Sequence, residues 1–270
     1  MKYQLFISDY DGTLGLAPRN NIDSETLDAI KKFTDKGGIF VVCTGRETSS
    51  IMRILKAHGL EGVVASFQGA RITEIQSGRV IFNGGLDAKT ALEALDAVDG
   101  SGLTPIAYGE SELYVQERNP YVELYERAVN LYGKVTDIKE EVLRQGENVS
   151  KICWLGDENV VYDVEKRLNE VYKGKRLKFN SGAKCLLEAI NPEHGKGNAV
   201  RIIADHYGVP LDKILAVGDS TNDVDLIVGP WHGVAVGDGK EQLKAVAKEV
   251  TVPFSEKPVK VLLEKYCIND

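Results

Sequence analysis

Four aspartates follow two short apolar runs of the sequence, in a pattern that suits metal binding. Asp9 and Asp11 come directly after Leu5–Ser8, and Asp219 and Asp223 come after Ile214–Val217. If the two runs are strands of one sheet, the four carboxylates gather at one edge, where their repulsion raises at least one pKa. A hard divalent cation removes that repulsion, and oxygen ligands without His or Cys indicate Mg²⁺.

Each of these acidic motifs also has a simpler explanation. Asp9-Tyr10-Asp11-Gly12 is compatible with a solvated turn. It also resembles half of a calcium loop, although Gly12 comes too early for the EF-hand spacing. Asp223 on its own is compatible with the N-cap of a following helix. The sequence leaves these alternatives open.

Thr44 and Lys196 are suited to bind an anion, which carboxylates cannot do. Thr44 lies between the apolar run Ile39–Cys43 and a predicted helix, so its hydroxyl and the neighbouring N–H groups suit an anion. Lys196 stands at the start of a predicted helix, where the helix dipole disfavours a cation. An anionic partner is therefore expected there, with plain solvent exposure as the alternative. Gly197 stands where a Walker loop needs Ser or Thr, which excludes that motif.

Together these groups suit phosphoryl transfer through an aspartyl phosphate. In that chemistry Asp9 attacks phosphorus. Asp11 protonates the leaving oxygen and then takes a proton from the attacking water. Mg²⁺ and Lys196 neutralise charge on the phosphoryl oxygens.

The elements that must position these residues alternate along the chain. Leu5–Ser8, Ile39–Cys43 and Ile214–Val217 are continuous apolar runs, which is typical of strands buried on both faces. Apolar stripes predict helices over residues 24–36, 47–58 and 197–207. This order predicts an α/β fold, a Rossmann-like parallel sheet with helices on both faces. Ligands of such sheets bind at the carboxyl ends of the strands.

The middle of the chain has a mixed order of elements. Helices are predicted over 87–98, from Asn119 to Gly133 and over 158–172, with a strand-like segment at Leu113–Val115. We therefore expect an inserted α+β domain over residues 84–183. Residues 1–83 and 184–270 would then form the core domain.

Composition narrows the class of protein further. The chain has 270 residues, with 33 Lys and Arg against 40 Asp and Glu, a formal net charge of −7 that argues against nucleic-acid coating. No apolar run approaches the roughly 18 residues of a membrane span, and the N-terminus lacks a signal-peptide pattern. The four cysteines are scattered, as in a reducing cytosol. We expect a cytoplasmic protein, monomer or homodimer, with neither nucleic acid nor membrane as a partner.

The motifs together resemble the haloacid dehalogenase (HAD) superfamily, and within it the Cof-type phosphatases with a type IIB cap. Asp9-Tyr10-Asp11-Gly12-Thr13-Leu14 matches the first motif, Thr44-Gly45-Arg46 the second, Lys196 the third, and Gly218-Asp219-x-x-Asn222-Asp223 the fourth. The resemblance covers nearly the whole chain. One departure lies near the expected phosphate site, where Gln68 in Phe67-Gln68-Gly69-Ala70 replaces the usual Asn.

The resemblance implies a role for each matching residue. Asp9 would be nucleophile and metal ligand, and Asp11 the acid and base, with its backbone carbonyl on Mg²⁺. Asp219 would be a metal ligand, and Asp223 a ligand or its supporting acceptor. The phosphate would be held by the second, third and fourth motifs, namely by Thr44, Gly45, Arg46, Lys196 and Asn222. The insertion would be the cap that selects the substrate, with Arg118 and Lys184 as candidate contacts.

The expected activity is Mg²⁺-dependent hydrolysis of a small phosphorylated metabolite, such as a sugar phosphate or a phosphoglycerate derivative. Mannosyl-phosphoglycerate phosphatases belong to the same group. A phosphomutase or phosphotransferase built on the same residues is one alternative. A non-enzymatic, phospho-accepting signalling module is another, because such modules also combine an acidic cluster with a lysine.

Overall fold

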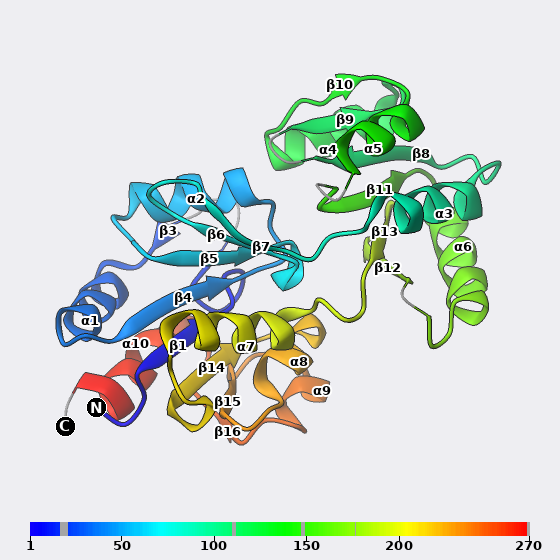
Figure 1. Cartoon of the computed structure of the whole chain (residues 1–270). Coiled ribbons are helices and arrows are strands. Elements are labelled where there is room, and N and C mark those ends of the chain that lie inside the picture. The colour runs from blue at the N-terminus through cyan, green and yellow to red at the C-terminus, as the bar shows by residue number, and fades with distance from the viewer. Residues whose placement is uncertain (17–20, 110–111, 147–148, 176, 269–270) are drawn as a thin grey trace. The chain divides into compact units, whose positions relative to one another are not determined.

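The computed structural model describes residues 1–16, 21–109, 112–146, 149–175 and 177–268. They form two compact units, each considered by itself: a core unit of Met1–Phe82 and Gly195–Asp270, and an inserted unit of Asn83–His194. The colours of Figure 1 run from the blue and cyan core through the green inserted unit and back to the yellow and red core. None of the helices in these residues combines the length and apolar character that crossing a membrane requires.

The described residues of the core unit build one eight-stranded sheet, in the order β16-β15-β14-β1-β4-β5-β6-β7. In that order its strands are Glu249–Val250, His232–Ala235, Ile214–Gly218, Leu5–Ser8, Ile39–Cys43, Val63–Ser66, Arg71–Glu74 and Val80–Asn83. Each pairing from β16 to β5 is parallel, whereas β6 runs antiparallel to β5. The predicted parallel α/β sheet is confirmed. A short antiparallel pair, β2 (Gly15–Leu16) with β3 (Asn21–Ile22), follows β1.

Helices cover both faces of this sheet. They are α1 Ser24–Asp35, α2 Thr48–Ala57, α7 Lys196–Tyr207, α8 Val224–Ile227, α9 Glu241–Lys244 and α10 Pro258–Leu263. Phe6 of β1 packs in the apolar cluster of α1, α2 and α10, while its neighbours Leu5 and Ile7 pack with α7 and α8. Burial of each such side chain contributes roughly 1.5–3 kcal/mol. Two apolar layers thus hold the strands whose ends carry the polar motifs.

The predicted helices of the core begin and end near the expected residues. Asp23 caps α1, since its carboxylate accepts hydrogen bonds from the amides of Glu25 and Thr26. Gly208, with φ +66°, ends α7 in the left-handed conformation. The N-cap of α7 is Gly195, which has no side chain to cap the helix. The first turn of α7 therefore needs a partner from elsewhere in the chain.

In the inserted unit, the described residues form a six-stranded sheet in the order β10-β9-β8-β11-β13-β12. These strands are Lys134–Val135, Leu113–Val115, Thr104–Tyr108, Lys151–Leu155, Leu186–Ile190 and Lys178–Ala183. The helices are α3 Ala88–Val98, α4 Pro120–Val129, α5 Ile138–Gln145 and α6 Glu158–Val171. Trp154, Phe179 and Leu187 of the sheet are buried in one apolar cluster with residues of α3, α5 and α6.

Two boundaries differ from the expected ones. The helix α4 is capped by Asn119 and spans Pro120–Val129. Its C-cap is Asn130, whose φ of +52° is left-handed, so the helix does not reach Gly133. The second boundary between the units lies at His194/Gly195 and not at 183/184. Leu186–Ile190 pairs with β11 and β12 of the inserted unit, so it belongs to that unit although it lies after residue 183. An apolar strand looks the same in either sheet, and only its pairing partner assigns it.

Candidate active site

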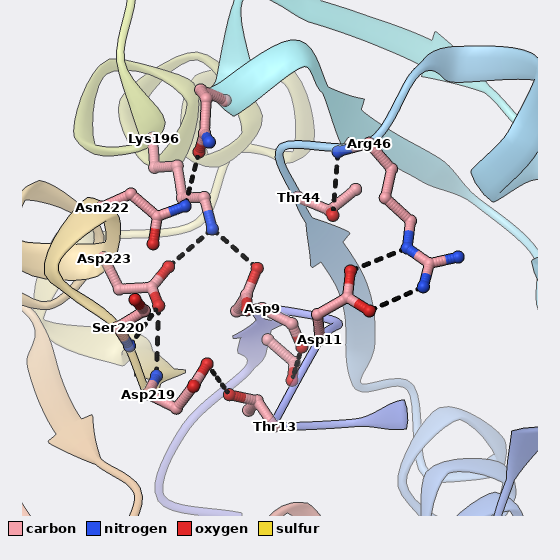
Figure 2. Close-up of polar contacts among 12 residues, drawn as sticks. Asp9, Asp11, Thr13, Thr44, Arg46, Lys196, Asp219, Ser220, Asn222 and Asp223 are labelled. Atoms are coloured by element: carbon pink, nitrogen blue, oxygen red, sulfur yellow. Dashed lines mark hydrogen bonds and ion pairs between the residues drawn. The ribbon is translucent and has the colours of Figure 1, made fainter. Parts of the chain in front are cut away.

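The polar motifs meet because β4, β1 and β14 are neighbouring parallel strands. The loops that follow these three strands leave from the same edge of the sheet. They carry Thr44–Arg46, Asp9–Thr13 and Asp219–Asp223, and Figure 2 shows these residues converging with Lys196. Side chains separated by more than two hundred positions in the sequence therefore share one site.

Three carboxylates lie together at the centre of the site. One oxygen from each of Asp9, Asp219 and Asp223 falls within 4.8 Å of the others. Asp9 and Asp223 are buried. Burial raises the pKa of Asp9 to about 7, with Lys196 opposing the shift and Asp223 adding to it. Burial also raises the pKa of Asp219 to about 6, again with help from Asp223.

Lys196 is the buried cation of this cluster. Its Nζ donates to Asp9 Oδ1 at 2.6 Å and to Asp223 Oδ1 at 2.5 Å, and the residue is 1% exposed. Burial alone would lower the pKa of this lysine, but the carboxylates of Asp9 and Asp223 raise it above its ordinary value. Lys196 is therefore charged, and its anionic partners are carboxylates of the site. Plain solvent exposure is wrong for this residue.

Asp223 precedes α8, but its side chain makes no capping hydrogen bond to that helix, so the simple N-cap explanation of this residue is wrong. Its Oδ2 accepts hydrogen bonds from the amides of Asp219 and Ser220 at 3.1 and 3.0 Å, which closes a capping box with Ser220. Its Oδ1 binds Lys196 at the same time. The capping contacts thus fix the carboxylate that holds the lysine.

The first motif packs directly against Asp219. A Cβ at Gly12, whose φ is +80°, would lie 2.6 Å from Asp219 Oδ2, so only glycine fits there. The hydroxyl of Thr13 donates to Asp219 Oδ1 at 3.3 Å. The contact orients Asp219 toward the other carboxylates (Figure 2).

Asp11 lies outside the triad of carboxylates and is paired with Arg46. The Nε and Nη2 of Arg46 donate to the two carboxylate oxygens of Asp11 at 2.7 and 2.6 Å. The guanidinium also lies 4.6 Å from the centre of the Tyr10 ring, a cation–π contact. A phosphate would have to compete with Asp11 for this arginine.

The remaining residues predicted to bind phosphate lie in two loops. Thr44 is buried, and its Oγ1 accepts from the amide of Arg46 at 3.2 Å. The carboxamide of Asn222 donates to that of Gln68 at 3.1 Å, and Gln68 packs over Gly45. Gln68 therefore links the second motif to the fourth.

Asp225 has a position in the site that sequence reasoning did not assign. Its Oδ2 accepts from the amide of Gly197 at 3.0 Å and so caps the first turn of α7, which Gly195 cannot cap. A Cβ at Gly195 would lie 2.3 Å from the same oxygen. The signal in the sequence was the glycine on each side of Lys196, which leaves room for a carboxylate from another helix.

The two candidate contacts of the inserted unit have partners of their own. Arg118 pairs with Glu126, which is 1% exposed, and donates to the carbonyl of Gly133 at 2.8 Å. Lys184 is exposed and lies 3.5 Å from a carboxylate oxygen of Glu158. Their contact with a substrate stays a prediction.

The chain belongs to the family of haloacid dehalogenase-like hydrolases, whose model matches residues 6–262. It is a phosphatase of that superfamily. A Haemophilus influenzae protein named as a phosphatase is 27% identical over 98% of both chains. The HMP-PP phosphatase of Citrobacter koseri is 25% identical over 90% of this chain and 88% of its own.

Solved structures show the same fold. The HAD subclass IIB sugar phosphatase BT4131 superposes with a TM-score of 0.78, at 20% identity, over 98% of this chain and 99% of its own. The family match and the phosphatase relatives identify this chain as an enzyme and not as a non-enzymatic signalling module.

Protonation of the acidic cluster should make the stability of the metal-free protein depend on pH. The pKa of Asp9 is about 7 in the folded state and 3.8 as the ordinary value, so between these values the folded state holds a proton that the unfolded state has released. Stability from this group therefore falls as pH rises from about 4 to about 7. In thermal unfolding with a chelator present, the Tm of Asp9→Asn should increase relative to that of the wild type as pH rises across that range. The exposed control Asp28→Asn should show no such increase in Tm. If the plots of Tm against pH for Asp9→Asn and the wild type run parallel, the raised pKa is contradicted.

Arg118 should matter for the stability of the inserted unit. Arg118→Ala leaves the buried carboxylate of Glu126 with the amide of Gly133 as its remaining hydrogen-bond donor in the described residues. We expect a loss of roughly 2 kcal/mol or more in the free energy of unfolding, measured with denaturant. Unchanged stability together with a raised KM would instead assign Arg118 to the substrate.

Proposed function

We propose that the protein hydrolyses a small phosphorylated metabolite in a Mg²⁺-dependent reaction that passes through an aspartyl phosphate on Asp9. The observation that carries this proposal is the buried contact of Lys196 with both Asp9 and Asp223, beside a third carboxylate. A lone lysine cannot balance three carboxylates. Burial raises the pKa values of Asp9 and Asp219, and the neighbouring carboxylate of Asp223 adds to both shifts.

The donors of the triad fit Mg²⁺. Asp9, Asp219 and Asp223 present oxygen atoms alone, which is the ligand set of a hard divalent cation. By the resemblance to the superfamily, the backbone carbonyl of Asp11 would complete the set. When bound, Mg²⁺ supplies positive charge against the carboxylates and the phosphoryl oxygens.

Two contacts of Asp9 support its proposed role as nucleophile. Its backbone is fixed by a hydrogen bond from its amide to the carbonyl of Val217, and its Oδ1 is held by Lys196. A carboxylate oxygen of Asp9 attacks phosphorus, the ester bond to the leaving oxygen breaks, and an acyl phosphate forms. Water then attacks that phosphorus, which releases inorganic phosphate and restores the carboxylate.

Asp11 is the residue that moves protons in both steps. It gives a proton to the leaving oxygen in the first step and takes one from the attacking water in the second. The two hydrogen bonds from Arg46 orient its carboxylate.

The inserted unit is proposed as the cap that selects the substrate. The substrate is expected to be a sugar phosphate or another small phosphorylated metabolite. Two relatives support that class, one named for HMP-PP and one for a sugar phosphate.

The described cysteines are free thiols, which supports a reducing, cytoplasmic setting.

Phosphate release from a panel of phosphorylated metabolites tests the activity and its nucleophile. The wild type should release phosphate from at least one sugar phosphate, and Asp9→Asn should lower kcat by about 10⁴-fold or more. Asp28→Asn, an exposed change on α1 of the same chemical kind, should leave kcat unchanged. Wild-type turnover by Asp9→Asn would rule out the covalent route, and no release by the wild type would overturn the phosphatase proposal.

Thermal unfolding with and without Mg²⁺ tests the metal site apart from catalysis. At a hundredfold excess over its Kd, Mg²⁺ should stabilise the wild type by about 2.7 kcal/mol. Asp219→Asn removes one of the crowded carboxylates, so at pH 8 without metal its Tm should exceed that of the wild type. The same variant should lose most of the Mg²⁺-dependent rise. A rise of equal size in both proteins would place the metal elsewhere.

A further inference from the structure

Phe67 and Gln68 form a strained turn beside the proposed active site. Both have left-handed backbone, with φ of +51° and +60°, and neither is glycine. Such conformations are unfavourable for bulky residues and persist where the surrounding structure imposes them, often at functional sites. Two consecutive instances call for an account of what holds them and what they place.

The loop that carries the turn is held from two sides. The amide of Phe67 donates to the carbonyl of Arg46, and the amide of Gln68 donates to the carbonyl of Thr44, each at 2.9 Å. On the other side, a Cβ at Gly69 would lie 2.8 Å from the carbonyl oxygen of Gly195, so this loop packs closely on the start of α7. The turn is thus clamped between the second motif and the helix that carries Lys196.

The clamp directs the side chain of Gln68 into the space between two predicted phosphate-binding loops. Its Oε1 accepts from Asn222 Nδ2 at 3.1 Å. Its Nε2 lies over Gly45, where a Cβ would come within 2.5 Å of that nitrogen. In the part of the chain that the structure describes, Nε2 donates to no acceptor. An N–H donor is therefore left available between Gly45 and Asn222.

We propose that Gln68 binds the phosphoryl group of the substrate through its side-chain amide nitrogen. This inference rests on the proposed function and adds a residue to its phosphate site. The carboxamide supplies a neutral donor for a phosphoryl oxygen, so it binds the anion without adding charge to a site already crowded with carboxylates. The hydrogen bond with Asn222 turns the two amides as one unit. The left-handed backbone of Phe67 and Gln68 directs this side chain toward Gly45 and Asn222.

Gln68→Glu separates donation to phosphate from support of Asn222. The glutamate has the same length and can still accept from Asn222 Nδ2, but it has no donor and carries a negative charge. Gln68→Gly serves as the control for folding, because glycine adopts the left-handed backbone without strain. We expect its Tm to equal or exceed that of the wild type although the amide is gone.

Two measurements on the full chain with Mg²⁺ test the proposal. Titration with inorganic phosphate should show at least tenfold weaker binding for Gln68→Glu and Gln68→Gly than for the wild type. With the best monoester of the panel, kcat/KM should fall by about 10²-fold in both variants, the size seen when one donor to a developing anion is removed. Gly45→Ala keeps its own amide but displaces Gln68 Nε2, so it should reproduce the loss.

The outcomes are distinguishable. Wild-type phosphate affinity and kcat/KM in Gln68→Glu would overturn the proposal and leave Gln68 as a support for Asn222. The same result in Gln68→Gly would remove even that role. If the wild type hydrolyses no monoester, the proposed function fails, whereas weaker binding of inorganic phosphate by the uncharged variant Gln68→Gly would still support the donor. Loss of Tm in Gln68→Gly would contradict the strain argument.

Discussion

The ammonium group of Lys196 is the one positive charge, among the described residues, that lies between the buried carboxylates of Asp9 and Asp223. A buried carboxylate without a partner is strongly unfavourable, and so is a buried ammonium. The three groups can therefore be buried together but not apart. Helix α7 must therefore begin beside the carboxyl ends of β1 and β14. The apolar side chains on one face of those strands pack against α7 and hold it in that position. Asp225 stabilises that start by capping its first turn.

The same contact leaves the site short of positive charge. Asp219 adds a third carboxylate, and the pKa values of Asp9 and Asp219 are raised above their ordinary value as a consequence of burial and of Asp223. The metal-free site thus lowers the stability of the fold, as does the left-handed pair Phe67–Gln68. Two apolar layers on the sheet offset these costs. The protein is thus less stable in the absence of ligands because it keeps a site that a divalent cation and a phosphoryl group would complete.

Much of the core could be predicted from the sequence because its signals are local. Leu5–Ser8 and Ile39–Cys43 are continuous apolar runs, and both are central strands of the sheet. The position of Lys196 at a helix start indicated an anionic partner, and Asp9 and Asp223 are such partners. Contacts between distant segments have no comparable signal. The bond of Asp225 to Gly197 and that of Gln68 to Asn222 depend on how loops meet after folding. Leu186–Ile190 was assigned to the wrong unit for the same reason, since its composition does not say which strand it pairs with.

The central claim is that Asp9 carries the phosphoryl group during turnover, and mass spectrometry can observe it directly. Asp11→Asn removes the residue proposed to activate the attacking water. With a monoester whose leaving group needs no protonation, such as p-nitrophenyl phosphate, the first step does not depend on Asp11, so the acyl phosphate should persist long enough to trap by acid quench. The account predicts a phosphoryl mass on the peptide that contains Asp9, with fragment ions that assign it to that residue, and none in the Asp9→Asn, Asp11→Asn double variant. Product release at every quench time without a phosphoryl group on Asp9, or with one on another residue, would contradict it.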